Sequence, residues 1–278
     1  MPPFGGNFKS SRGRSKYRCP PAISIAGNLA AAAGALGVLL WYASSVPSSQ
    51  VFGPALVRGR VDRPLVTLTF DDGPATPFTE QILDILRDRQ VLATFFVCGQ
   101  NVERHPEIVR RIADEGHTLG NHTYSHPFPY FLSRRRMAEE IDRTQQAIEN
   151  ATGQRPAVFR PPYGARWFGL YPVLQERGLK VVQWSDTGYD WKCDARATVR
   201  ATLEHLGPGS VILLHDGLEG TQGFLKWAWR EVFASGERAA PHSLRPDRSH
   251  VVEALPQIID GARQAGFQFV PLEVFLST

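Results

Sequence analysis

Short apolar runs alternate along most of this chain with longer segments in which apolar residues recur at helical spacing. Such runs are typical of buried strands, and such segments are typical of helices packed on one face. The expected strands are 65–70, 93–97, 118–120, 158–160, 180–184, 211–214 and 267–270, and the expected helices are 79–90, 106–115, 134–151, 167–177, 195–205 and 252–264. Glycine follows three of these helices, at Gly116, Gly178 and Gly266, as expected where a helix ends. Alternation repeated about seven times, without a doubly wound fingerprint, predicts an α/β fold with a parallel sheet and favours a (β/α) barrel of about seven strands.

The N-terminal part has a different pattern. Residues 21–43 are apolar apart from Ser24 and Asn28, and Trp41 and Tyr42 lie at the far end. At about 1.5 Å per residue this stretch forms a helix of roughly 34 Å, enough to cross a hydrocarbon core of about 30 Å. Aromatic side chains favour the membrane interface. We therefore expect a transmembrane signal-anchor helix over 21–43.

The charges suggest an orientation for this helix. Five of the 31 Lys and Arg residues precede residue 20, which leaves 26 cations against 27 acidic residues in the rest of the chain. We expect a basic cytoplasmic tail over 1–20, a linker over 44–60 and an extracytoplasmic catalytic domain over 61–278, in a single-pass protein of the cell membrane. A cleaved signal peptide is the alternative, because small residues follow the apolar stretch. The remaining charge gives no reason to expect nucleic-acid binding.

Polar residues able to do chemistry collect at the carboxyl ends of the expected strands. These ends share one face in a barrel, the face that carries active sites. The clusters are Asp71-Asp72-Gly73-Pro74, Asn121-His122-Thr123-Tyr124-Ser125-His126, Arg160-Pro161-Pro162-Tyr163-Gly164, Ser185-Asp186 with Asp190-Trp191, and His215-Asp216. Five clusters on one face predict one catalytic site.

Two of the clusters predict a metal site. His122 and His126 lie four residues apart and present both imidazoles on one side if the segment turns helically, and an Asp from another strand supplies a third ligand. Two histidines and one carboxylate leave coordination positions open, as in a catalytic site. Asp71 and Asp72 repel each other if both ionise in one apolar site, so we expect a metal to take one and a guanidinium, with Arg160 as the candidate, to take the other.

In this order the residues resemble the polysaccharide deacetylases of carbohydrate esterase family 4, the NodB-homology domain. The resemblance covers about residues 60–275 and rests on Thr69-Phe70-Asp71-Asp72-Gly73, His122-Thr123-x-x-His126, Arg160-Pro161-Pro162-Tyr163-Gly164, Asp190-Trp191 and Leu213-x-His215. It implies a distorted (β/α) barrel and a divalent metal, zinc first, with cobalt, nickel or manganese as alternatives. It also implies hydrolysis of acetamido groups on N-acetylglucosamine-type sugars.

The resemblance also implies roles for single residues. Asp71 would be the general base, with Asp72, His122 and His126 as the metal ligands. Arg160 would orient Asp71, and the backbone N–H of Tyr163 would join the oxyanion site. His215 would be the general acid that protonates the departing amine, with Asp190 as the carboxylate that keeps it protonated. The other histidines are expected to be structural or surface residues: His105, His117, His205, His242 and His250.

The chain departs from the family pattern in two places. The fourth motif is often written Asp-x-x-Asp-Trp, whereas Asp186 lies four residues before Asp190, so Asp190 is the stronger candidate. Residues 217–249 form an insertion directly after the expected His215 strand. Trp227 and Trp229 within it either stack on sugar rings as a lid or belong to a helix that packs on the barrel or dips into the bilayer.

The expected partners are an N-acetylated glycan, such as peptidoglycan or a related envelope or extracellular polysaccharide, and the membrane through the N-terminal helix. The alternatives are an amide hydrolase on a smaller acylated substrate, a non-catalytic glycan-binding domain, and a two-carboxylate glycosidase with Asp71 and Asp190. The oligomeric state and the pairing of Cys98 with Cys193 stay open at this point.

Overall fold

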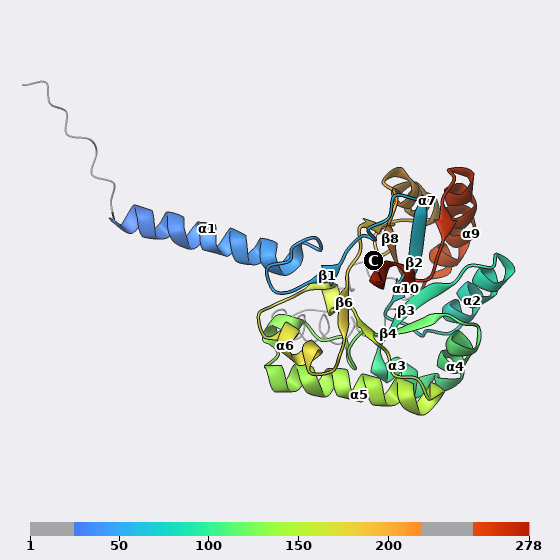
Figure 1. Cartoon of the computed structure of the whole chain (residues 1–278), viewed down its shortest axis with the longest axis horizontal. Coiled ribbons are helices and arrows are strands. Elements are labelled where there is room, and N and C mark those ends of the chain that lie inside the picture. The colour runs from blue at the N-terminus through green and yellow to red at the C-terminus, as the bar shows by residue number, and fades with distance from the viewer. Residues whose placement is uncertain (1–24, 218–246, 278) are drawn as a thin grey trace, which may run out of the picture. The chain divides into compact units, whose positions relative to one another are not determined.

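The computed structural model describes residues 25–217 and 247–277, with side chains from residue 34 onward (Figure 1). The strands are β1 (Ala55–Leu56), β2 (Leu65–Asp71), β3 (Ala93–Val97), β4 (Thr118–Asn121), β5 (Val158–Phe159), β6 (Lys180–Val182), β7 (Asp186–Thr187), β8 (Val211–His215) and β9 (Gln268–Phe269). The α-helices are α1 (Ile25–Ser45), α2 (Phe78–Asp88), α3 (Gly99–Arg104), α4 (Pro106–Asp114), α5 (Arg134–Thr152), α6 (Leu170–Gln175), α7 (Ala195–Glu204), α9 (Ser249–Gln264) and α10 (Glu273–Leu276). Two 3₁₀ turns, η1 (Pro129–Phe131) and η2 (Pro162–Gly164), complete the described elements. Each expected strand is present within two residues of its expected bounds, and each expected helix within three.

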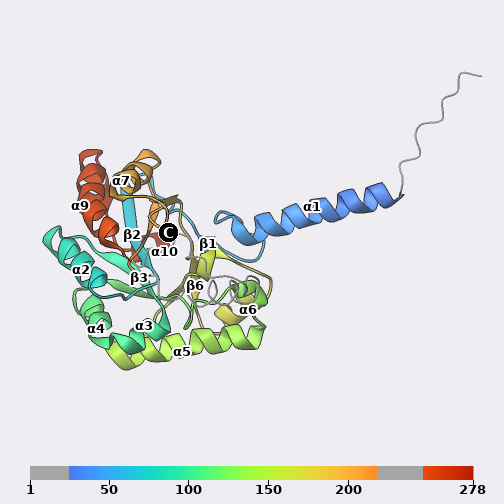
Figure 2. The ribbon, with the colours of Figure 1, turned by 180° about the vertical axis from the view of Figure 1, so that it is seen from behind.

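The sheet is parallel but it does not close. Eight strands follow one path in the order β1-β6-β5-β4-β3-β2-β8-β7, and β9 pairs with β2 beside that path. The expected α/β fold with a distorted parallel barrel of about seven strands is thus confirmed in part: the described strands form a curled, open half-barrel with eight strands along its path. The two edge strands, β1 and β7, each of which is two residues long, were not predicted from the sequence. Helices surround the outside of the curled sheet (Figures 1 and 2).

Alternation along β2 separates the core from the site. Val66, Leu68 and Phe70 belong to the large apolar core together with residues of α2, and the Phe70 ring stacks on Phe95 of β3 with centroids 5.0 Å apart. Successive side chains of a strand point to opposite faces, so Thr69 and Asp71 point the other way, into the half-barrel. Asp71 lies opposite His215 in the register of β2 with β8. Two polar side chains are thus carried to the same level of adjacent strands.

The contacts divide the chain into two compact units, residues 1–40 and 41–278. Among the described residues, no helix combines the length and the apolar character that a membrane crossing requires. The expected linker over 44–60 is partly built into the second unit. Its β1 joins the sheet beside β6, and the buried Arg166 donates to the carbonyls of Val46, Pro47 and Ser49.

Candidate metal centre and active site

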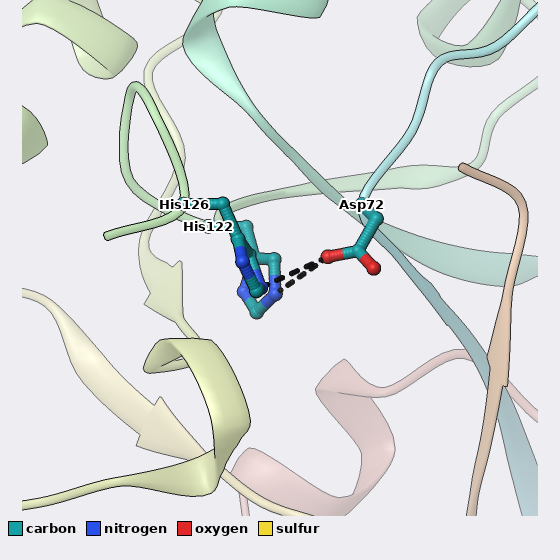
Figure 3. Close-up of side chains that lie close together, drawn as sticks. All are labelled: Asp72, His122 and His126. Carbon is teal, nitrogen blue, oxygen red and sulfur yellow. Dashed lines mark ion pairs between the residues drawn. The ribbon is translucent and has the colours of Figure 1, made fainter. Parts of the chain in front are cut away.

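Three buried side chains converge at the carboxyl ends of β2 and β4. Oδ1 of Asp72 lies 3.3 Å from Nε2 of His122 and 3.1 Å from Nε2 of His126, and the three ligand atoms all lie within 4.8 Å of one another (Figure 3). Despite these distances, Asp72 Oδ1 makes no hydrogen bond to any residue that the structure describes. A buried carboxylate oxygen without a hydrogen bond requires another partner. Two imidazole nitrogens and one carboxylate oxygen around a common point fit a divalent metal and leave coordination positions open.

The electrostatics of Asp72 agree with this arrangement. Burial raises the pKa of Asp72, but the charge of His126 and the close contacts with His122 and His126 outweigh it. The pKa of Asp72 therefore lies well below its ordinary value, and the side chain is a carboxylate. A metal ligand must be deprotonated in the same way.

The segment that carries the two histidines is an irregular loop rather than the helical turn that their spacing allows. Thr123 and His126 have positive φ angles of 67° and 53°. Glu140 of α5 secures this loop: its Oε2 accepts the backbone N–H groups of Tyr124 at 3.0 Å and Ser125 at 2.8 Å, and its Oε1 accepts the Ser125 hydroxyl at 2.9 Å. The strained backbone is thus held by a carboxylate from a distant helix.

Hydrogen bonds from residues other than the three proposed metal ligands orient His122 and Asp72. Nδ1 of His122 lies 2.7 Å from the carbonyl oxygen of Arg160, so this nitrogen carries the proton and Nε2 presents its lone pair toward Asp72 and His126. The side chain of Asn101 donates to the carbonyl oxygen of Asp72 at 2.8 Å. These bonds fix the ring of His122 and the backbone of Asp72.

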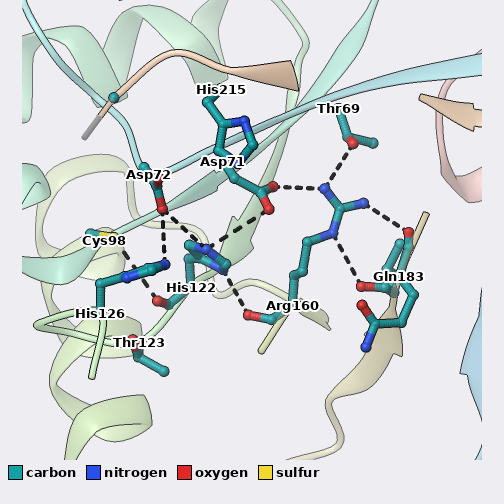
Figure 4. A network of polar contacts seen from close by, with 12 residues as sticks. Thr69, Asp71, Asp72, Cys98, His122, Thr123, His126, Arg160, Gln183 and His215 are labelled. Carbon is teal, nitrogen blue, oxygen red and sulfur yellow. Dashed lines mark hydrogen bonds and ion pairs between the residues drawn. The ribbon is translucent and has the colours of Figure 1, made fainter. Parts of the chain in front are cut away.

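Asp71 is held by the fully buried Arg160, as expected (Figure 4). Nη1 of Arg160 donates to Asp71 Oδ1 at 2.6 Å and to Thr69 Oγ1 at 2.8 Å. Its Nε and Nη2 donate to the carbonyls of Val182 and Gln183, which fixes the guanidinium. The second carboxylate oxygen, Oδ2, lies 3.8 Å from Nε2 of His122, next to the metal ligands.

A second ion pair lies at the end of β8. Nδ1 of His215 lies 3.0 Å from Oδ1 of Asp190, and Oδ2 of Asp190 accepts the backbone N–H of His215 at 3.1 Å. Arg248 lies 3.4 Å from the same carboxylate, and Nε2 of His250 lies 2.7 Å from the Asp190 carbonyl. Burial lowers the pKa of His215, but the charge and hydrogen bond of Asp190, together with the charge of Asp72, outweigh it, so the net pKa lies above its ordinary value. The edge of the Trp191 ring packs against His215 with centroids 5.4 Å apart.

Tyr163 lies beside the metal ligands. It has a positive φ of 59° within η2, and its ring lies 4.8 Å from the ring of His126. Its backbone N–H has no acceptor among the described residues, and its side chain is 40% exposed. The donor is therefore available to a ligand at this edge of the site.

Other sequence candidates lie outside the site. Asp186 accepts from Arg58 at 3.0 Å and from Ser185 at 2.6 Å, which is a structural ion pair. Nδ1 of the buried His117 accepts the backbone N–H of Ala93 at 3.2 Å. Asp186 thus pairs away from His215, whereas Asp190, the stronger candidate in the sequence, contacts His215.

The sequence also left open the pairing of two cysteines and the role of two tryptophans in the insertion. Cys98 and Cys193 are both free cysteines. Trp227 and Trp229 lie outside the described residues, as does most of the insertion, of which the structure describes Gly217 and residues 247–249.

The structure adds two residues that the sequence did not single out, Glu140 of α5 and Arg248 at the start of α9, which no local motif marks. His250, expected to be a structural or surface residue, contacts the carbonyl of Asp190. Asp216 was visible in the cluster after the β8 strand but had no role. It is fully buried and accepts from Thr79 Oγ1 at 2.7 Å, and burial raises the pKa of Asp216 to about 7.

Known proteins are similar to this chain in sequence and in fold. The polysaccharide deacetylase family model matches residues 58–182. A peptidoglycan-N-acetylglucosamine deacetylase of Bacillus cereus is 42% identical over 158 residues, which cover 56% of this chain and 58% of that protein. A chitooligosaccharide deacetylase of Sinorhizobium fredii is 34% identical over 207 residues, which cover 72% of this chain and 94% of that protein.

A solved structure is similar across most of the fold. It is the crystal structure of a peptidoglycan N-acetylglucosamine deacetylase in complex with a naphthalenyl-N-oxidanyl-benzamide, with a TM-score of 0.67 and 34% identity, covering 81% of this chain and 93% of that one. The chain spans less than two thirds of the length of the Bacillus cereus relative. The match to the Sinorhizobium fredii protein covers nearly all of that relative, however, and the chain belongs to the polysaccharide deacetylase family, carbohydrate esterase family 4.

Proposed function

We propose that this protein is a divalent-metal-dependent hydrolase that removes N-acetyl groups from N-acetylglucosamine-containing glycan, such as peptidoglycan or chitooligosaccharides. One observation carries the proposal. A carboxylate held by Arg160 and a histidine held by Asp190 lie at the same level of β2 and β8, beside the Asp72-His122-His126 set. A base, a metal site and an acid at one place are what hydrolysis of an amide requires.

Asp72, His122 and His126 would hold the metal. A divalent cation supplies a Lewis acid that polarises the acetamide carbonyl and acidifies the attacking water. We propose zinc, because two imidazoles and one carboxylate with open positions are typical of catalytic zinc sites.

The chain's own groups move the protons. Asp71 accepts the proton of the attacking water through Oδ2, because Arg160 occupies Oδ1. The backbone N–H of Tyr163 donates to the oxyanion that forms on the carbonyl. His215 then donates its proton to the departing amine, and Asp190 keeps that proton on the ring until it is needed.

Of the two other enzyme alternatives, the structure argues against the glycosidase. Asp190 is buried and faces His215 and Arg248, which does not suit a carboxylate that flanks a glycosidic bond. An amide hydrolase on a smaller substrate would use the same groups, so only substrate tests separate it from the proposed function.

We also propose that the N-terminal segment anchors the protein to the cell membrane with the catalytic unit outside the cytoplasm. The support is the apolar stretch over 21–43 and the five cations before it. Recovery of the chain in the membrane fraction, with protease access from outside to residues after 50, tests this proposal. Release of a shortened soluble protein would instead indicate cleavage.

Acetate release from N-acetylglucosamine oligomers tests the function. We expect activity that is lost with a chelator, restored by zinc and lost in Asp71→Asn, with metal binding retained in that variant. Metal binding without acetate release would favour another acyl amide, and absence of metal binding would refute the mechanism. Hydrolysis that survives the chelator would favour a glycosidase or another metal-free reaction.

A further inference from the structure

Exposed aromatic rings gather on the loops that follow β4 and β5. Phe131 of η1 and Phe168 are 72% and 71% exposed, and Tyr130 beside Phe131 is exposed as well. Their neighbours Leu132 and Trp167 pack on one buried cluster, formed with residues of α5 and α6. The exposed rings therefore flank the same part of the core. Large rings that are exposed together mark an interaction surface.

Three consecutive arginines begin α5 beside these rings. Arg134, Arg135 and Arg136 occupy its first turn, which contains no acidic residue. The macrodipole disfavours cations at a helix N-terminus, so the stability of the helix gives no reason for this charge. Glu139 pairs with both Arg135 and Arg136, whereas Arg134 lies over the Phe168 ring at 5.9 Å and has no ion pair to any described residue. Together these side chains form the aromatic-arginine surface: Tyr130, Phe131, Phe168, Arg134, Arg135 and Arg136.

The end of the N-terminal apolar stretch is fixed against this surface. The hydroxyl of Ser45 lies 3.5 Å from the hydroxyl of Tyr130, and the backbone N–H of Arg166 donates to the carbonyl of Ser44 at 3.0 Å. The buried Arg166 side chain holds three further carbonyls of the segment after Ser45. Residues 41–45, the last turn of α1, belong to the same compact unit as the surface. The chain therefore enters this unit next to the aromatic-arginine surface.

The helix rise places this contact relative to a membrane. Trp41 and Tyr42 lie at the end of the apolar stretch, and such rings favour the boundary between hydrocarbon and headgroups. Ser45 follows Tyr42 by about 4.5 Å along the helix. The headgroup layer on one side of a bilayer is roughly 5–7 Å thick. In a chain anchored as proposed above, Tyr130 would therefore lie at the level of the headgroups.

We propose that the aromatic-arginine surface contacts the membrane, with its rings among the headgroups of anionic phospholipids and its arginines paired with their phosphates. The proposal rests on the proposed membrane anchor and not on the proposed reaction. Aromatic rings beside guanidinium groups suit this interface, and the phosphates offset the cations in the first turn of α5. The Phe128 ring lies 5.1 Å from Tyr130 and 5.2 Å from Tyr163. The contact would thus hold the Tyr163 edge of the site close to the bilayer.

Quenching by lipids in the full chain tests this contact. The chain is inserted one per nanodisc, which excludes contact with a second copy, and an environment-sensitive fluorophore is attached at Phe131→Cys, Phe168→Cys or Gln264→Cys. Both cysteines other than the buried Cys98 are replaced by Ser. Gln264 is the control, because it is exposed at the end of α9, which lies well apart from α6 in both views of the fold (Figures 1 and 2).

We expect lipids with a quencher on the headgroup to quench the fluorophore at the two phenylalanine positions and not at Gln264→Cys. The quenching should be strong with phosphatidylglycerol in the disc and fall with phosphatidylcholine alone. Arg134→Gln combined with Arg135→Gln should also lower it, whereas the same change of charge on α7, Arg196→Gln combined with Arg200→Gln, should not.

Two results would overturn the proposal directly. Equal quenching at all three labelled positions would show no preferred contact. Quenching that is independent of lipid charge and of the arginines would show that the linker alone brings the surface near the membrane. A raised KM for soluble N-acetylglucosamine oligomers in the labelled chains, without quenching, would assign the rings to glycan and overturn the proposal as well.

The failure of this proposal differs from the failure of the others. Loss of the chain from the discs would refute the anchor, and binding of the same chain to phosphatidylglycerol vesicles would then decide the surface. There we expect binding about 25-fold weaker in the variant without Arg134 and Arg135, about fivefold for each arginine. Absence of binding by the unchanged chain would refute the surface. Absence of acetate release would refute the proposed reaction and leave the quenching as expected.

Discussion

Replacement of Asp190 by Asn provides a sharp test of the proposed acid. Asn keeps the shape of the side chain and an oxygen for the backbone N–H of His215, but it removes the charge that lies 3.0 Å from Nδ1. Burial then acts on His215 without its main opposing partner, so the pKa of His215 falls.

The direction and the size of the expected change in activity follow from the contact between Asp190 and His215. A general acid must be protonated, so activity falls as pH rises through the pKa of His215, and a lower pKa moves this alkaline limb to lower pH. A hydrogen bond to a charged group contributes about 1.5–3 kcal/mol, which corresponds to a roughly 10- to 100-fold loss on the alkaline side. The loss should shrink as the pH is lowered. Arg248, His250 and the more distant Asp72 are unchanged in the variant.

The assay is kcat/KM for acetate release as a function of pH. Asp186→Asn is the matched control, because Asp186 is a buried carboxylate four residues away that pairs with Arg58 and not with His215. Asp186→Asn should leave the alkaline limb of the kcat/KM profile at the same pH, even if it lowers the stability of the protein. An unshifted limb in Asp190→Asn, or an equal shift in both variants, would refute the assignment of His215 as the acid supported by Asp190.

Three further predictions concern the residues around the site. Arg160→Met should destabilise the protein by about 3–5 kcal/mol, because it leaves the buried Asp71 carboxylate unpaired, and Arg160→Met combined with Asp71→Asn should recover part of that loss in thermal unfolding. Additive losses would contradict this explanation. Glu140→Gln should weaken zinc binding about 10- to 100-fold in chelator competition, because it loosens the loop that carries two ligands, whereas Glu139→Gln on the exposed side of the same helix should not. Burial lowers the pKa of His117 from 6.5 to about 4. The neutral ring therefore contributes fully to the free energy of unfolding above pH 6.5, and about 3 kcal/mol of this stability is lost as the pH falls toward 4. In His117→Asn, the free energy of unfolding should fall less steeply between pH 6.5 and 4 than in the unchanged protein. An equal fall in both proteins would show that other groups cause the loss of stability in acid.

Much of the site could be predicted because a parallel α/β sheet brings the carboxyl ends of its strands to one edge. Asp71, His122, Arg160 and His215 each lie at the end of an expected strand or within two residues after it, and the structure brings all four together. Apolar runs and helical spacing are local signals, so the strands and helices that carry these residues were also visible in the sequence.

The edges of the sheet were not predictable in this way. β1 and β7 lie in no apolar run that the sequence analysis singled out, so the sequence predicted about seven strands and left out both edges of the sheet. Whether a sheet closes depends on pairing between strands far apart in the chain.

The sequence by itself determined seven of the strands and six of the helices, the family, and the chemical groups that meet at the carboxyl ends of the strands, since these follow from local pattern and motif spacing. The tertiary structure alone decided how those groups are held. Glu140 secures the histidine loop from α5, and Arg248 and His250 reach Asp190 from the start of α9. Such contacts join residues about 15 to 60 positions apart, and their physical cause is the packing of helices on the sheet, which no short stretch of sequence encodes.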